Sequence, residues 1–144
     1  MNWDEYFLSI AQVTASKSKD PSTKVGAVIV RPDRTIVSVG YNGFPRGVAD
    51  TPERLNDRAV KYSLVVHAEM NAILSARESL NGCTLYTTPF MPCDRCFMHV
   101  IQAGIKRVVF PPATAEQNER WGAAFATVRT LAKETNIYLI EYTS

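Results

Sequence analysis

The sequence predicts an α/β protein, a three-layer α/β/α sandwich built around a five-stranded mixed sheet. Two observations predict this class. Five short segments rich in apolar and β-branched residues are separated by turns or by segments with helical periodicity. After an initial hairpin the strands alternate with helices, in the order α-β-β-α-β-α-β-α-β. Because a helix joins each of the last three strands to the one before it, we expect those three strands to run parallel with right-handed crossovers.

The first half of the chain supplies a helix and the hairpin. Asp4 can cap a helix whose apolar side chains return at three- and four-residue spacing. The continuous apolar run at 25–30 is typical of a strand covered on both faces. The expected elements are a helix over 4–17, strands over 25–30 and 35–39 around a turn at 31–34, a Gly- and Pro-rich loop over 40–47, and a polar region over 48–64 that is mostly loop.

The second half repeats a helix–strand unit three times. Gly82 and Gly104 each follow a helical segment and are typical of helix C-terminal ends. Apolar residues on one stripe predict that the last helix packs on the sheet. The expected helices cover 67–79, 93–103 and 119–134, and the expected strands cover 83–88, 107–110 and 137–142.

Bulk properties place the chain among ordinary soluble proteins. Its 144 residues suit a single domain over 1–144, with 46% hydrophobic and 21% charged residues. The net charge of +2 is spread along the chain, which argues against a protein that coats nucleic acid. No apolar run approaches the roughly 20 residues that cross a bilayer, and the N-terminus lacks the pattern of a signal peptide. We therefore expect a cytoplasmic enzyme with neither a membrane nor a nucleic-acid partner.

Two short motifs carry the chemistry. His67-Ala68-Glu69 opens one predicted helix, and Cys93 and Cys96 lie in a Pro-Cys-x-x-Cys segment that opens the next. This pairing of H-x-E with P-C-x-x-C is typical of zinc-dependent base deaminases. Zinc takes thiolate and imidazole ligands in a tetrahedron, and catalytic sites keep one position for water. The sequence therefore predicts one zinc ion per chain, held by His67, Cys93 and Cys96.

Glu69 is too near this predicted metal to be idle and is not needed as a ligand. Zinc lowers the pKa of bound water from ~15.7 toward ~7, so hydroxide is available near neutral pH. We expect Glu69 to carry a proton from that water to the ring nitrogen beside the attacked carbon, and then to the departing amine. Attack at C4 of cytosine by this route yields uracil and ammonia.

The cysteine pair has two other interpretations, a redox pair and part of a structural zinc site. A redox pair would not need a partner histidine and glutamate, and a structural zinc site would need a fourth cysteine or histidine. His99 follows Cys93 by six residues, a rotation of about 120° and a rise of ~9 Å on a helix, so one metal cannot readily take both. His99 is expected to be an ordinary surface or core residue, and Cys83, the third cysteine, a buried strand residue.

Taken together, these segments resemble the deoxycytidylate deaminases of the cytidine deaminase superfamily, over residues 4 to 110. The resemblance is carried by 20–30 (DPSTKVGAVIV), 40–47 (GYNGFPRG), 67–73 (HAEMNAI), 85–88 (LYTT), 92–96 (PCDRC) and 101–105 (IQAGI). It implies a five-stranded α/β/α fold and conversion of dCMP to dUMP, a precursor for thymidylate synthesis in pyrimidine metabolism.

The resemblance also implies roles for particular residues. Asn42 would contact the sugar hydroxyl, the backbone N–H of Ala68 would bind the pyrimidine carbonyl, and Lys24 with Ser22 and Thr23 would contact the phosphate. Members of the family are commonly homohexamers, or else dimers, activated by dCTP and inhibited by dTTP with magnesium. The candidate effector residues here are Gly40, Tyr41, Asn42, Gly43 and Arg46.

Other substrates and another class of protein stay open on sequence grounds. A related cytosine nucleotide (dCTP, CMP or a 5-substituted dCMP) would use the same site. A tRNA or polynucleotide base deaminase shares the zinc core but needs a basic, aromatic groove, which the modest net charge argues against. A non-catalytic nucleotide-sensing module would not need Glu69. Ammonia release across a panel of substrates separates these alternatives.

Overall fold

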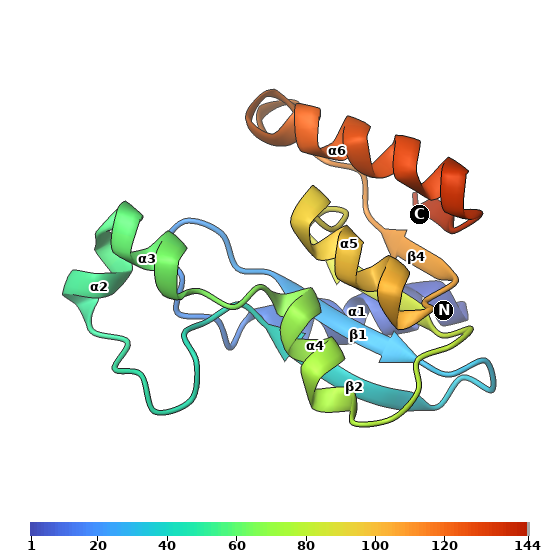
Figure 1. The fold of residues 1–144 in the computed structure, drawn as a ribbon, viewed down its shortest axis with the longest axis horizontal. Coiled ribbons are helices and arrows are strands. Elements are labelled where there is room, and N and C mark those ends of the chain that lie inside the picture. Colours follow the sequence, from blue (N-terminus) through green and yellow to red (C-terminus); the bar gives the residue numbers. More distant parts are fainter. Residues whose placement is uncertain (144) are drawn as a thin grey trace.

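The computed structural model describes residues 1–143 and contains one mixed sheet between two helical layers (Figure 1). The sheet has five strands in the order β2-β1-β3-β4-β5. The strands are β1 (Gly26–Val30), β2 (Ile36–Tyr41), β3 (Thr84–Thr88), β4 (Arg107–Phe110) and β5 (Tyr138–Glu141). The helices are α1 (Trp3–Ala15), α2 (Pro52–Asn56), α3 (Arg58–Leu64), α4 (Ala68–Ala76), α5 (Asp94–Ala103) and α6 (Ala115–Thr135).

The pairing of the strands confirms the predicted mixed sheet. β1 is antiparallel to both of its neighbours, β2 and β3. β3, β4 and β5 pair in parallel, as expected for strands joined by helices. The carboxyl ends of these parallel strands therefore meet at one edge of the sheet, where open α/β sheets place their sites.

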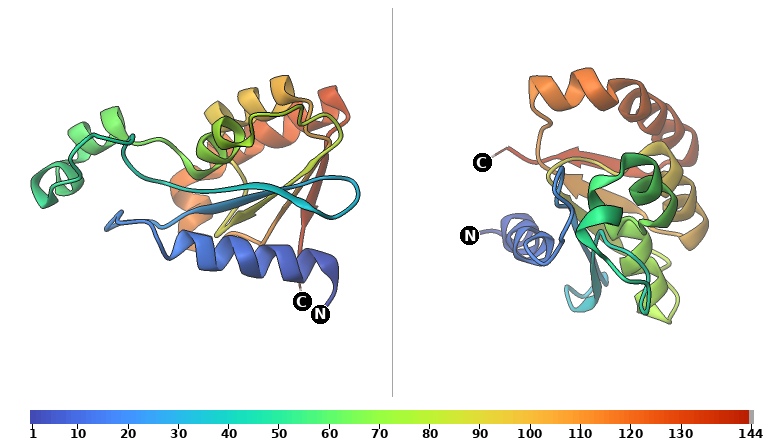
Figure 2. Two further views of the ribbon diagram at one scale, coloured as in Figure 1. Left: turned by 90° about the horizontal axis from the view of Figure 1, so that it is seen from below. Right: turned by 90° about the vertical axis from the view of Figure 1, so that its left-hand side faces the viewer.

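Helices cover the two faces of the sheet unequally. Figure 2 shows α1 alone on one face, while α4, α5 and α6 lie on the other. Val28 and Val30 pack toward α1 with Phe7, whereas Ala27 and Ile29 pack into the larger core under α4, α5 and α6. All five β1 residues are consequently buried, which explains the continuous apolar run in the sequence.

Two glycines let helices approach the sheet closely. A Cβ on Gly26 would lie 1.9 Å from the carbonyl oxygen of Ala11 in α1, and a Cβ on Gly40 would lie 2.4 Å from that of Ala68 in α4. Both distances are shorter than any real contact, so neither position admits a side chain without moving a helix. The Gly40 contact matters for function because α4 begins directly after His67.

The structure corrects the expectation that residues 48–64 are mostly loop. This region forms the short helices α2 and α3, of five and seven residues. Thr51 caps α2 and precedes Pro52 at its first position, and Asp57 caps α3. These caps are visible in the sequence, but helices this short carry too few turns for an apolar period to show.

Two helix boundaries differ from the predicted ones by three residues or more. α6 begins at Ala115, four residues earlier than expected, because Thr114 and Gln117 form a reciprocal capping box. α4 ends at Ala76 because Arg77 adopts the left-handed conformation, with φ of 51°.

Within residues 1–143, no helix has the length and apolar character that a membrane crossing requires.

A polar network ties α1 to the sheet. Arg107 of β4 donates to both carboxylate oxygens of Asp4, at 3.1 and 2.8 Å, and the Tyr86 hydroxyl donates to Asp4 Oδ1 at 2.7 Å. The hydrogen bonds from Arg107 lower the pKa of Asp4 below its ordinary value of 3.8. Burial, together with the neighbouring carboxylate, raises the pKa of Tyr86 to about 12.

Replacing Asp4 with asparagine should lower the free energy of unfolding by about 2 kcal/mol at neutral pH, because charge-assisted hydrogen bonds are lost. A lowered carboxyl pKa stabilises the fold above the unfolded pKa, and this stabilisation is lost as pH falls through the folded-state pKa. The difference between wild type and Asp4→Asn should therefore shrink below pH 3.8. Urea denaturation from pH 7 to pH 3 measures it, with Glu5→Gln as the unpaired control. A difference that does not change with pH would contradict this role.

Candidate active site

The two predicted motifs lie at the first turns of neighbouring helices. His67 is the N-cap residue of α4, and Cys93 is the N-cap residue of α5. Cys93 follows β3 through a short loop, and α4 and α5 pack against each other. Both helices therefore begin near the carboxyl end of β3. At this edge of the sheet, His67 lies close to Cys93 and Cys96, which follow it by 26 and 29 residues in the sequence.

The donor atoms of these residues form a cluster that fits a metal ion. His67 Nδ1 lies 3.5 Å from Cys93 Sγ and 3.3 Å from Cys96 Sγ, and the three donor atoms lie within 4.8 Å of one another. Zinc bonds of ~2.3 Å to sulfur and ~2.1 Å to nitrogen, at a tetrahedral angle, put two ligands about 3.6 Å apart. The observed spacing is close to this value. Two sulfurs and one imidazole are a zinc donor set that leaves a fourth position for water.

Backbone groups of both helices favour thiolates at this site. The backbone N–H of Cys96 donates to Cys93 Sγ at 3.5 Å, as expected at the start of α5. Hydrogen bonds from the Cys96 thiol and from His67 lower the pKa of Cys93 to about 4. The pKa of Cys96 is raised, chiefly because its thiol donates to Cys93, while the backbone N–H of Met70 opposes this shift. Met70 is a contributor that no sequence motif indicated.

Glu69 is the acidic group at this site. It lies in the first turn of α4 and is 4% exposed. Burial, with a smaller effect of Cys93, raises its pKa to about 7. A carboxyl group that is buried yet free of a fixed cationic partner can gain and lose a proton readily near neutral pH. This is the property that a proton shuttle needs.

Comparison with known proteins agrees with this geometry. The family model described as the cytidine and deoxycytidylate deaminase zinc-binding region matches residues 1–111. The chain belongs to the cytidine and deoxycytidylate deaminase family. This deaminase is 47% identical over 120 residues to an uncharacterised deaminase of Aliivibrio fischeri, a match spanning 83% of the chain and 80% of that protein. It is 42% identical over 130 residues to the deoxycytidylate deaminase of Mus musculus, spanning 86% of the chain and 72% of that protein.

Solved structures confirm the fold of the deaminase. The cyanophage S-TIM5 dCMP deaminase in complex with dCMP and dUMP matches with a TM-score of 0.74 and 23% identity, covering 96% of this chain and 95% of that one. The diaminohydroxyphosphoribosylaminopyrimidine deaminase/5-amino-6-(5-phosphoribosylamino)uracil reductase of Thermotoga maritima matches with a TM-score of 0.68 and 30% identity, covering 96% of this chain and 36% of that one. The five-stranded cytidine deaminase fold predicted from the sequence is thus confirmed.

The remaining cysteine and the remaining histidine are not part of the metal-binding cluster. Cys83 is 2% exposed and belongs to the apolar core, so it is buried as expected, but it lies directly before β3 and not within the strand. His99 is exposed on α5, and its Nδ1 lies 3.0 Å from the carbonyl oxygen of Arg95. The cluster of metal-binding side chains found within residues 1–143 consists of His67, Cys93 and Cys96.

Asn42, the predicted sugar contact, is almost fully buried and already hydrogen-bonded within the chain. Its Oδ1 accepts from the backbone N–H of Val25 at 2.9 Å, and its Nδ2 donates to the carbonyl of Thr23 at 2.9 Å and to Asp20 at 3.5 Å. These bonds join the segment before β1 to the end of β2. One lone pair of Oδ1 is left for a hydroxyl of a substrate.

Asp20 and Lys61 form a buried ion pair next to Asn42 that was not predicted from the sequence. Lys61 is 6% exposed, and its ammonium group lies 3.2 Å from Asp20 Oδ1. Asp20 also accepts backbone hydrogen bonds from Ser22 and Thr23. Asp20 and Lys61 thereby anchor α3 to the loop that holds Asn42. They are 41 residues apart, and no sequence pattern pairs them.

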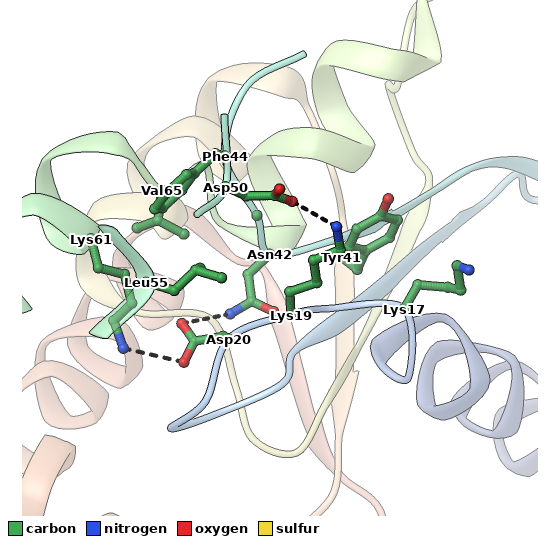
Figure 3. Close-up of a pocket in the computed structure, with 11 residues that line it drawn as sticks. Lys17, Lys19, Asp20, Tyr41, Asn42, Phe44, Asp50, Leu55, Lys61 and Val65 are labelled. Atoms are coloured by element: carbon green, nitrogen blue, oxygen red, sulfur yellow. Dashed lines mark hydrogen bonds and ion pairs between the residues drawn. The ribbon is translucent and has the colours of Figure 1, made fainter. Parts of the chain in front are cut away.

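Three of the five predicted effector residues line one cavity, and the other two do not. Tyr41, Asn42 and Gly43 line a cavity of about 160 Å³, beside which Lys17 and Lys19 project (Figure 3). Asp50 also lines this cavity, where its carboxylate pairs with Lys19 at 3.0 Å. The close contact of Gly40 with α4 keeps that residue out of the cavity lining, and Arg46 is exposed outside it.

The predicted phosphate contacts are also divided. Ser22 lines a second hollow together with residues of α2, α3 and α6, and its hydroxyl is 3.3 Å from Lys61 Nζ. Thr23 contributes its backbone to Asp20 and Asn42. Lys24 is exposed and lines neither this hollow nor the cavity of Figure 3. Ala68 is fully buried at the first position of α4, where the backbone N–H has no partner within the helix.

Proposed function

We propose that this chain catalyses the zinc-dependent hydrolysis of dCMP to dUMP and ammonia. The single observation that carries the proposal is the cluster of one imidazole and two thiols with Glu69 on the same helical turn as His67. The similarity to the mouse deoxycytidylate deaminase supports the substrate. One water is added across C4 of cytosine and one ammonia leaves, so the reaction needs no further reactant.

His67, Cys93 and Cys96 would hold the zinc ion, which supplies an activated water near neutral pH when bound. Glu69 accepts a proton at its carboxylate, delivers it to N3 of cytosine, and later transfers a proton to the departing amino group. Because Glu69 is buried, bulk water does not compete for this proton. The first turns of α4 and α5 place positive dipole ends at the site, which favours the thiolates.

Two further groups would position the pyrimidine nucleoside. The backbone N–H of Ala68 would donate to the cytosine carbonyl oxygen, since no helical carbonyl accepts it. Asn42 would accept the hydrogen of a sugar hydroxyl at the remaining lone pair of Oδ1. Lys24 with Ser22 and Thr23 is the sequence-based site for the phosphate.

Nucleotide control and assembly extend this proposal. The cavity beside Lys17 and Lys19 would take a triphosphate effector, dCTP as activator or dTTP as inhibitor, with Mg²⁺ on the phosphates. Tyr41, Asn42 and Gly43 would contact it, and Arg46 would reach it from the exposed loop. We further propose a homohexamer or dimer acting in the cytoplasm, in the pyrimidine metabolism that feeds thymidylate synthesis.

A substrate panel tests the proposal. Ammonia release by the zinc-loaded enzyme should be fastest, as kcat/KM, with dCMP, and slower with CMP, dCTP, cytidine and a tRNA anticodon loop. Adding dCTP and dTTP to the dCMP reaction tests the effector cavity in the same assay. Faster turnover of the anticodon loop would favour the tRNA deaminase, and no ammonia from any substrate would favour the sensing module.

A further inference from the structure

A hollow outside the zinc cluster is lined by cationic and polar side chains. It has a volume of about 430 Å³. Its lining contains no acidic residue and consists of Pro21, Ser22, Leu55, Asn56, Arg58, Lys61, Tyr62 and Arg120. Lys61 is already paired with Asp20, so the uncompensated positive charge of the lining comes from Arg58 and Arg120.

Arg58 and Arg120 converge on one phenol oxygen. Arg58 Nε donates to the Tyr62 hydroxyl at 3.1 Å, and Arg120 Nη2 donates to the same oxygen at 3.4 Å. Within residues 1–143 neither guanidinium forms an ion pair with a carboxylate, whereas Arg31, Arg107 and Arg129 each do. Two like charges held at one oxygen repel each other unless an anion joins them.

The phenol itself is prepared to bind an anion. Because its oxygen accepts from both arginines, its own hydrogen is left to donate. The hydrogen bond from Arg58, followed by that from Arg120, lowers the pKa of Tyr62, which reports a positive field at this oxygen. Guanidinium forks and a hydroxyl donor are the groups that bind phosphate oxygens in proteins.

Chain connectivity and aromatic packing link the hollow to the catalytic residues. Tyr62 precedes His67 by five residues, of which the first two steps are helical, so their Cα atoms are at most about 16 Å apart. On the other side, Cζ of Arg120 lies 4.5 Å from the centroid of the Trp121 ring, and the centroids of the Trp121 and Phe90 rings are 4.9 Å apart. Phe90 precedes Cys93 by three residues. Figure 1 shows that α4, α5 and α6 all begin on the side of the molecule that faces α3.

We propose that Arg58, Arg120 and the Tyr62 hydroxyl bind the 5′-phosphate of the substrate, and that they select nucleotides over nucleosides. This inference rests on the proposed deamination of a cytosine nucleotide, whose base lies at the zinc cluster. It assigns the phosphate to α3 and α6, elements that the sequence-based site at Lys24 does not include.

The test compares dCMP with deoxycytidine, which lacks the phosphate. Arg58→Gln and Arg120→Gln should each lower kcat/KM for dCMP by about 10-fold or more, since each removes a charge-assisted hydrogen bond. The double variant should lose most of the preference for dCMP while its kcat/KM for deoxycytidine stays within about twofold. Inorganic phosphate should inhibit the wild type competitively with dCMP and should inhibit the double variant much less, which decides the question even where deoxycytidine turnover is too slow to measure.

Matched variants separate this proposal from simpler explanations. Arg54→Gln removes a neighbouring α2 arginine that does not line the hollow, and it should keep the wild-type preference. An equal loss with both substrates in the arginine variants would indicate a structural role and overturn the assignment. So would Lys24→Gln abolishing the preference while the arginine variants keep it. If the wild type deaminates dCMP and the arginine variants keep their selectivity, this inference alone fails; if the wild type deaminates no cytosine nucleotide, the proposed function fails with it.

Discussion

Glu69→Gln should reduce kcat for dCMP by about 10³-fold or more while the protein keeps its zinc. General acid–base groups contribute about 10²–10⁴-fold, and here one carboxyl group would serve two proton transfers in succession. Glutamine has nearly the shape of glutamate, but its amide cannot exchange a proton with water or with the ring nitrogen. Because the glutamine amide is neutral, the variant buries no charge at this position, where the side chain is 4% exposed. The variant should therefore fold normally.

Steady-state kinetics together with elemental zinc analysis measure this effect. Glu116→Gln, an exposed residue in the first turn of α6, is the control for loss of one carboxylate. Its kcat should match the wild type. Activity of Glu69→Gln within tenfold of the wild type, at full zinc content, would refute the proton-shuttle role.

Cys96→Ala should lose zinc and, with it, all measurable deamination. Cys96 Sγ lies 3.3 Å from His67 Nδ1, so its removal takes one of three protein ligands from the cluster. An imidazole and one thiolate do not hold zinc against chelators as three ligands do. Zinc per chain should fall from about one to a small fraction after dialysis against a chelator, and the melting temperature should fall as well.

The third cysteine provides the matched control. Cys83 is as buried as Cys96 but lies in the apolar core, away from the cluster. Cys83→Ala should therefore cost some stability by leaving a small cavity and should retain its zinc. Equal zinc content in Cys96→Ala and Cys83→Ala would show that the ligand assignment is mistaken.

The residues of the candidate active site could be predicted because each of the two motifs is local in the sequence. His67 and Glu69 are two residues apart, and Cys93 and Cys96 lie within one helical turn. The spacing within each motif therefore predicts how its two side chains lie relative to each other. The order of the strands and of the helices other than α2 and α3 also followed from the local hydrophobic period. The boundaries that failed, at the start of α6 and the end of α4, depend on a capping box and on one left-handed residue.

The sequence by itself determined the five strands, the order of the helices α1, α4, α5 and α6, and the four side chains of the candidate active site. Only the tertiary structure decided what surrounds them: the Asp20–Lys61 pair that orders the Asn42 loop, and the convergence of Arg58 and Arg120 on Tyr62. Arg120 is 58 residues from Tyr62. Periodicity and motif spacing report on neighbours along the chain, whereas these contacts arise when packing of apolar faces brings distant helices together.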